Sequence, residues 1–179
     1  RNLTSNLQKA ADGNLLISID QEGGEVVRLK TKYGFEKTIS AEKLGEINDP
    51  NYTYEKISIL ADDLLKTGIN LNFAPVVDLN INPDSPAIGK LERSFSKDPN
   101  IVTRHAEVFI RDCHDKGILC VLKHFPGHGS ALADSHKGFV DVTDTWKRSE
   151  LVPYRKLIKE GVVDAVMTAH VFNGRVDKE

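Results

Sequence analysis

One segment gathers most of the side chains that could do chemistry. Residues 123–136, KHFPGHGSALADSH, hold three of the six histidines together with a lysine and an aspartate. Lys123 and His124 end an apolar run, and strict alternation along a strand would turn one of them away from a shared cleft. If both face the cleft, the backbone must leave regular geometry there, by a bulge or a strained peptide. Glycines on both sides of His128 indicate a loop able to move.

Asp134 and His136 have the spacing of a local acid–base pair. An aspartate that accepts the imidazole Nδ1–H fixes the tautomer and leaves Nε2 to give or take a proton. The same spacing is typical of an ordinary Asx turn in a solvated loop, so the motif alone leaves both interpretations open. A zinc site is a third alternative, because His124, His128, Asp134 and His136 are all ligand types. Their spacing matches no standard helical zinc motif, so we expect no metal and no other cofactor.

Two other segments offer polar groups beside apolar runs. Asp20 follows one such run and precedes Gly23 by three positions. A carboxylate there could accept hydrogen bonds from sugar hydroxyls, and the alternative is an ordinary turn or helix-capping aspartate. Arg28 could reach the same cleft, with a plain surface position as its alternative. Arg93 could also face the cleft, or it could pair with Glu92 in a loop.

Short apolar runs alternate with helical patterns along the chain. We expect strands over residues 15–19, 69–77, 118–124 and 162–169. Glycines at 68, 117 and 161 mark the expected helix ends. The inward-facing helical side chains are predicted to be Ile57, Leu60, Ala61, Leu64 and Leu65 between Tyr54 and Thr67; Val102, Ala106, Phe109, Ile110 and Cys113 after a start at Asp98–Pro99; and Leu157 and Ile158 after Ser149.

The loops indicate how these elements are arranged. Loops after the predicted strands are long and polar, whereas the segments before the strands are short glycine-containing turns. A (β/α) barrel has this asymmetry, with its active site at the carboxyl ends of the strands. A doubly wound sheet binds ligands at a single crevice, and Gly23–Gly24 is not a GxGxxG fingerprint. The predicted fold class is therefore α/β, a partial TIM-type (β/α)8 barrel with about four parallel strands.

Composition excludes some classes of protein. The 24 Lys and Arg residues against 26 Asp and Glu give a net charge of -2, which argues against a nucleic-acid partner. No run approaches the roughly 18 apolar residues of a membrane span. Cys113 and Cys120 form neither a disulfide framework nor a zinc pattern, so we expect buried, reduced thiols. Reduced thiols favour the cytoplasm, with a periplasmic or secreted location as the alternative, and the oligomeric state is not readable.

Taken together, the motifs resemble glycoside hydrolase family 3, in particular its bacterial β-N-acetylglucosaminidase branch of the peptidoglycan-recycling type. The matching segments follow one another along nearly the whole chain: LLISIDQEGGEVVRL, NFAPVVDLN, ERSFSKDP, KHFPGHGSALADSH and VMTAHV. The histidine-rich segment marks this branch best, since many members take their general acid from another carboxylate. The resemblance implies a retaining hydrolase that releases terminal β-linked N-acetylglucosamine from peptidoglycan- or chitin-derived oligosaccharides.

The resemblance also implies roles for individual residues. His136 is implied as the general acid/base, oriented by Asp134. The residues implied to hold the sugar hydroxyls are Asp20, Arg28, Arg93, Lys123 and His124. The nucleophile of the family is an aspartate beyond the VMTAHV strand, and neither Asp164 nor Asp177 stands in that motif. We therefore expect the nucleophile beyond residue 179, and residues 1–179 as an incomplete N-terminal catalytic domain that is inactive alone. Rival interpretations are a phosphorylase of the same family and a non-catalytic carbohydrate-binding protein.

Overall fold

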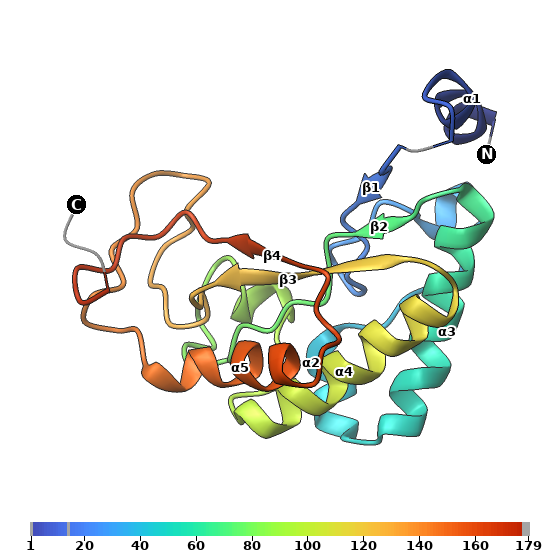
Figure 1. Ribbon diagram of the computed structural model, residues 1–179. Coiled ribbons are helices and arrows are strands. Elements are labelled where there is room, and N and C mark those ends of the chain that lie inside the picture. Colours follow the sequence, from blue (N-terminus) through green and yellow to red (C-terminus); the bar gives the residue numbers. More distant parts are fainter. Residues whose placement is uncertain (1, 14, 177–179) are drawn as a thin grey trace.

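The computed structural model describes residues 2–13 and 15–176. Four parallel strands form one sheet in chain order, as predicted: β1 (Ser18–Ile19), β2 (Leu71–Asn72), β3 (Leu119–Phe125) and β4 (Ala165–Thr168). The helices are α1 (Asn2–Ala10), α2 (Ala41–Ile47), α3 (Pro50–Thr67), α4 (Pro99–Asp115) and α5 (Val152–Lys159), with short 3-10 turns η1 (Thr31–Tyr33), η2 (Gly89–Leu91) and η3 (Arg148–Leu151). Helices α3, α4 and α5 cover one face of the sheet, while α1 stands apart beyond β1 (Figure 1).

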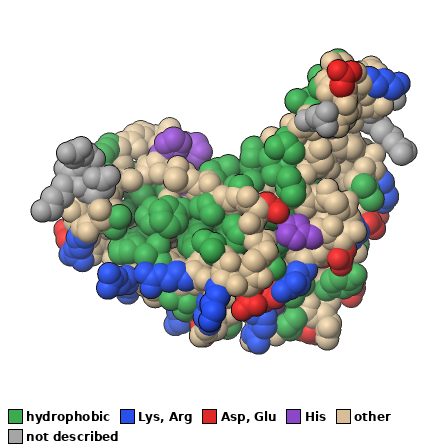
Figure 2. All heavy atoms as spheres, in the orientation of Figure 1, with side chains coloured by type: hydrophobic (Ala, Val, Ile, Leu, Met, Phe, Trp, Pro, Cys, Tyr) green, Lys and Arg blue, Asp and Glu red, His purple; other side chains and the backbone are tan. Residues whose placement is uncertain are grey.

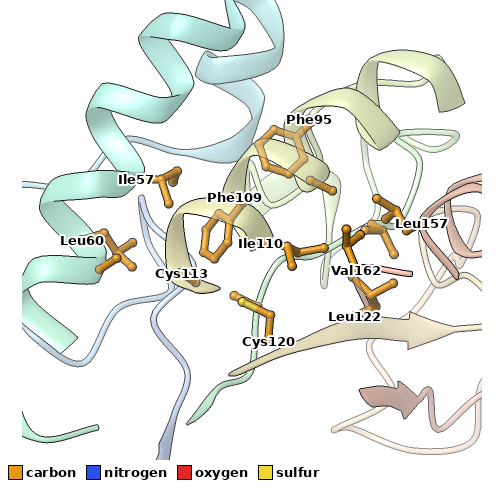
Figure 3. Packing of buried hydrophobic residues seen from close by; sticks show 14 of the residues in the cluster. Ile57, Leu60, Phe95, Phe109, Ile110, Cys113, Cys120, Leu122, Leu157 and Val162 are labelled. Carbon is orange, nitrogen blue, oxygen red and sulfur yellow. The ribbon is translucent and has the colours of Figure 1, made fainter. Parts of the chain in front are cut away.

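The core lies between α4 and the sheet. Helix α4 begins as predicted, with the Asp98 side chain accepting a hydrogen bond from the Asn100 N–H. Figure 3 shows Phe109 and Cys113 of this helix packed between α3 and Cys120 of β3. All five predicted inward side chains of α4 are buried. Both cysteines are buried free thiols, which confirms that prediction.

Two predicted inward side chains point to solvent instead. Leu65 of α3 is 55% exposed and Ile158 of α5 is 57% exposed. Each follows a leucine that is completely buried, Leu64 and Leu157 respectively. Successive residues are about 100° apart around a helix, so the second apolar residue of each pair lies beyond the narrow stripe that faces the sheet.

The predicted strands are longer than the paired ones. Only Ser18 and Ile19 of the run at 15–19 join the sheet, and Leu16 is 59% exposed because β1 is an edge strand among the described residues. In the run at 69–77 the ladder stops at Asn72, and Val76 makes an isolated bridge with Lys123. Pro75 lies between these two points and has no N–H to donate to a ladder.

No helix of the described residues is long and apolar enough to cross a membrane.

Candidate active site

The carboxyl ends of β1, β3 and β4 border one cavity of about 400 Å³. Six of the seven predicted site residues line it: Asp20, Arg28, Arg93, Lys123, His124 and His136. The seventh, Asp134, is hydrogen-bonded to His136. The wall also includes Glu22 and Met167. Side chains from distant parts of the sequence therefore meet at the strand ends, where barrel enzymes place their sites.

Strand β3 presents two successive side chains to this cavity. Lys123 and His124 both line it, although regular alternation would send one of them to the opposite face. The register of β3 against β4 shifts between Lys123 and Phe125, and the Lys123–His124 peptide bond is cis. The predicted departure from regular strand geometry is confirmed by the register shift.

A buried ion network forms the floor of the cavity. The Lys123 Nζ donates to Asp20 Oδ1 at 2.9 Å and lies 2.6 Å from Glu22 Oε1. Arg93 binds Glu22 through two parallel hydrogen bonds, from Nε to Oε2 and from Nη2 to Oε1, both 2.8 Å long. Burial alone would raise the pKa of Glu22, but the hydrogen bonds and charges of Arg93 and Lys123 hold it below its ordinary value. The carboxylate therefore stays ionised and fixes both cations.

Asp20 is more open to solvent than Glu22. Its Oδ2 is 3.3 Å from Arg28 Nη2, and both side chains are substantially exposed. Burial alone would raise the pKa of Asp20. The hydrogen bond and charge of Lys123, with the charges of Arg28 and Arg93, outweigh burial and hold the pKa below its ordinary value. Its remaining lone pairs can therefore accept hydrogen bonds from a ligand hydroxyl.

A second buried carboxylate, Asp78, does not line the cavity but orients His124 through its Nδ1 atom. It is completely buried and lies 2.7 Å from His124 Nδ1. Its oxygens also accept the backbone N–H of His128 at 2.8 Å and the backbone N–H of His124 at 3.2 Å. Burial opposes ionisation, but His124 and these N–H groups hold the pKa of Asp78 below its ordinary value.

These contacts fix the tautomer of His124. Arg93 Nη2 lies 3.3 Å from His124 Nε2, and a guanidinium has only donors. The Nε2 atom must therefore accept, so the proton sits on Nδ1 and is donated to Asp78. Both ring nitrogens of His124 are thus engaged in the described structure.

Sequence reasoning missed both Glu22 and Asp78. Glu22 lies two positions after the predicted Asp20, in the same DQEGG segment, and Asp78 directly follows the predicted strand at 69–77. Each was therefore available as a strand-end carboxylate. Their partners are 71 and 46 positions away in the sequence, so no local spacing indicates the pairing.

Asp134 and His136 form the predicted pair. The His136 Nδ1 lies 2.8 Å from Asp134 Oδ1, and the His136 backbone N–H donates to the same oxygen at 3.0 Å. The Asx turn and the side-chain pair therefore coexist. The backbone and side-chain hydrogen bonds from His136 lower the pKa of Asp134. The His136 side chain is 81% exposed, and His136 lines the cavity.

The loop that carries this pair, residues 125–136, is here called the histidine loop. Its base is held on two sides: Trp146 Nε1 donates to the Pro126 carbonyl at 3.0 Å, and Asn82 Nδ2 donates to the Ala131 carbonyl at 3.0 Å. Its outer part is open, and Leu132 is 72% exposed. The histidine loop is therefore held at Pro126 and Ala131, and His136 lies at the end of the exposed part that follows.

Two other titratable side chains, His105 and Asp164, lie away from the cavity. No three His, Cys, Asp or Glu side chains of the described residues are grouped as metal ligands. His105 is buried against Thr53, with its Nδ1 at 2.7 Å from the Thr53 hydroxyl. Asp164 accepts hydrogen bonds from the Cys120 N–H and from His114 and does not line the cavity. Asp177 lies outside the described residues.

Comparison with known proteins gives a consistent family. Residues 2–179 match the glycosyl hydrolase family 3 N terminal domain. A beta-hexosaminidase of Xylella fastidiosa (strain M12) is 38% identical over 184 residues, which cover 99% of this chain and 53% of that protein. The chain thus spans about half the length of this relative.

Two solved structures share the fold over 99% of the chain. A glycoside hydrolase family 3 beta-N-acetylglucosaminidase from Paenibacillus sp. str. FPU-7 has a TM-score of 0.90 and 41% identity, and 34% of it is covered. NagZ from Neisseria gonorrhoeae in complex with N-trifluoroacetyl-D-glucosamine has a TM-score of 0.89 and 32% identity, and 54% of it is covered. This agreement confirms the predicted fold class, a partial (β/α) barrel.

Proposed function

The chain belongs to glycosyl hydrolase family 3, and on this basis we propose that it provides the sugar-binding floor and the acid/base of a retaining β-N-acetylglucosaminidase. The observation that carries the proposal is the Asp134–His136 pair beside a cavity already lined by Asp20, Lys123 and Arg93. The two relatives named for N-acetylglucosamine or its analogue support the choice of sugar.

His136 acts as general acid and then as general base. Its Nε2 protonates the departing glycosidic oxygen, and later takes a proton from the water that releases the sugar. Asp134 holds the Nδ1–H, which keeps Nε2 in position and stabilises the imidazolium when it forms. A histidine in this role places no second negative charge beside an anionic nucleophile.

The nucleophile is proposed to be an aspartate from outside residues 1–179. A retaining glycosidase needs a carboxylate free to attack the anomeric carbon. The two carboxylates on the cavity floor, Asp20 and Glu22, are both engaged with Lys123. They therefore suit binding and positioning rather than attack.

The substrate is proposed to be an oligosaccharide with a terminal N-acetylglucosamine, derived from peptidoglycan or chitin. A cavity of about 400 Å³ lies at the lower end of the size range of small-ligand sites, which fits a single sugar ring. Asp20 offers acceptors, and Arg28, Arg93 and Lys123 offer donors for its hydroxyls.

The test is turnover by the full-length protein of two N-acetyl-β-glucosaminides, one with a sugar leaving group and one with an acidic aryl leaving group. We expect His136→Ala to lower kcat by about 10²–10⁴-fold, and less with an aryl leaving group that needs no protonation. His114→Ala is the control, because His114 is paired with Asp164 and does not line the cavity, and it should keep kcat within twofold. Equal losses for both leaving groups would contradict the acid role of His136.

Two further outcomes separate the rivals. Sugar 1-phosphate as the main product in phosphate buffer would replace hydrolysis by phosphorolysis. Binding of N-acetylglucosamine by the full-length protein without any turnover would indicate a carbohydrate-binding protein.

A further inference from the structure

We propose that Glu22 is a positioning residue that makes this cavity selective for uncharged sugars and closes it to anionic ligands. The inference rests on the proposed function, because it concerns the ligand of the same cavity. Glu22 acts through Arg93 and Lys123, whose donors and charges it occupies. Three observations carry it: the donors left free, the balance of charge, and the backbone that fixes Glu22.

Few donors of the two buried cations are left free. An arginine has five N–H groups and a lysine has three. In the described contacts Arg93 gives two to Glu22, one to His124 and one to the Ala87 carbonyl. Lys123 gives one to Asp20 and one to Glu22. Each cation therefore keeps one N–H, which suits a hydroxyl oxygen rather than an oxyanion that seeks several donors.

The charges that line the cavity cancel. At the buried floor the carboxylates Asp20 and Glu22 face the cations Arg93 and Lys123, while the exposed Glu25 and Arg28 add one charge of each sign to the wall. Lys123 and the Arg93 side chain are only 2% and 10% exposed, so water screens their charges only weakly. Without Glu22 two buried cations would face Asp20 alone, and the excess positive charge would attract an anion.

The position of Glu22 is set by the backbone and does not depend on a ligand. Its N–H donates to the Val26 carbonyl at 3.0 Å, closing a tight turn. Gly23 in that turn has φ +107°, and a Cβ there would lie 2.4 Å from the Ile39 carbonyl oxygen. The turn is therefore packed directly against a neighbouring segment, and Glu22 holds Arg93 and Lys123 before any sugar arrives.

The experiment measures sulfate as an anionic probe in the full-length protein. We expect sodium sulfate, compared with sodium chloride at equal ionic strength, to compete weakly with N-acetylglucosamine in the wild type. Glu22→Gln removes one charge with little change of shape and should tighten sulfate binding by about tenfold or more, measured by calorimetry and by competition with the sugar. Glu25→Gln is the matched control: it removes the same charge from the same wall without a contact to either cation, and should change sulfate binding by less than twofold.

A double variant tests the balance itself. Glu22→Gln/Lys123→Met removes one charge of each sign, and sulfate binding should return toward the wild-type value. Equal sulfate binding by Glu22→Gln and the wild type, with both shown to be folded by circular dichroism, would overturn the inference. Should Glu22→Gln not fold, the wild type still decides: sulfate competition at low millimolar concentration would overturn the inference, and competition that is weak or absent supports it. Failure of the proposed function would be distinguishable from failure of this inference. In that case the wild-type protein would show the expected sulfate binding but would cleave no N-acetylglucosaminide.

Discussion

At the scale of single residues, two buried carboxyl groups near the base of the histidine loop have opposite environments. Asp78 accepts hydrogen bonds from three N–H groups, those of His124 and His128. Glu150 is equally buried, but only its Oε1 is bonded, to the Lys147 N–H at 3.1 Å. Among the described residues its Oε2 has no partner. Hydrogen bonds favour the charged form of Asp78, whereas burial favours the neutral form of Glu150.

Asp78→Asn should weaken both the fold and sugar binding. The amide oxygen of asparagine can still accept from His124, but its NH2 group would face a backbone N–H and leave a buried donor without a partner. We expect a loss of about 1–3 kcal/mol in the free energy of unfolding, measured by urea denaturation, together with weaker binding of N-acetylglucosamine. Asp141→Asn, at an exposed position that accepts one backbone N–H, should change neither by a comparable amount. An unchanged unfolding free energy for Asp78→Asn would contradict the assignment.

Glu150→Gln should stabilise the protein at neutral pH and not in acid. Burial raises the pKa of Glu150, and the charge of Asp78 raises it further. The folded state therefore holds this proton more tightly than the unfolded chain, so stability falls as the pH rises above the ordinary glutamate pKa and stays lower above the raised one. Glutamine carries no such cost, and its NH2 group can donate to the neighbouring Ser130 hydroxyl. We expect a gain of about 1 kcal/mol at about pH 8 that disappears near pH 4.

Urea denaturation at both pH values checks this expectation. Glu160→Gln is the control, because Glu160 is exposed just after α5. A gain for Glu150→Gln that is equal at both pH values would show that hydrogen bonding alone causes it and would contradict the role of ionisation.

At the scale of elements, the four strands and helices α3, α4 and α5 are predicted from the sequence, whereas α1 and α2 are not. Asp98 and Pro99 start α4 where their pattern indicates, and Gly68 ends α3 with φ +76°. The same Asp–Pro signal at Asp49 and Pro50 starts α3 four residues before the predicted Tyr54. Asp49 and Pro50 are the same capping signal as Asp98 and Pro99, so this boundary is also predictable from the sequence.

Asp98→Ala should therefore destabilise the protein through α4. The substitution removes the hydrogen bond to the Asn100 N–H, 2.8 Å long, and a negative charge at the positive end of the helix. We expect a loss of about 1 kcal/mol in the free energy of unfolding. Asp115→Ala, at the other end of the same helix, removes a charge from the negative end and should cost nothing. Equal losses for the two variants would contradict the capping role.

Other parts of the fold and site could not be read from local patterns. Strand length depends on which neighbours are available for pairing, and Leu16 looks like a buried strand residue but lies at an edge. Asp20, Lys123 and His124 are predicted because they stand at strand ends, whereas Asp134 and His136 are predicted from their spacing. Glu22 and Asp78 become recognisable only when Arg93 and His124 are brought to them by the fold.

At the scale of the whole molecule, the sheet is covered unequally. Helices α3, α4 and α5 pack on one face, and α4 contacts both of its helical neighbours. Figure 2 shows hydrophobic side chains gathered on the surface near β4. Phe125 and Val166 there are 38% and 39% exposed. In the described part of the chain β4 pairs only with β3, so its outer edge presents unpaired backbone groups beside apolar side chains.

The 179-residue chain on its own should therefore self-associate through this edge. Unpaired strands with apolar neighbours add to one another, and a charged side chain on the edge opposes such pairing. We expect Val166→Lys to lower the weight-average mass in sedimentation velocity over a concentration series, because its ammonium group would be desolvated in any strand-to-strand contact. Ile47→Lys makes the same chemical change at a residue that is 49% exposed at the end of α2, and should leave the mass unchanged. An equal decrease for both variants would indicate that added charge, and not the edge of β4, controls association.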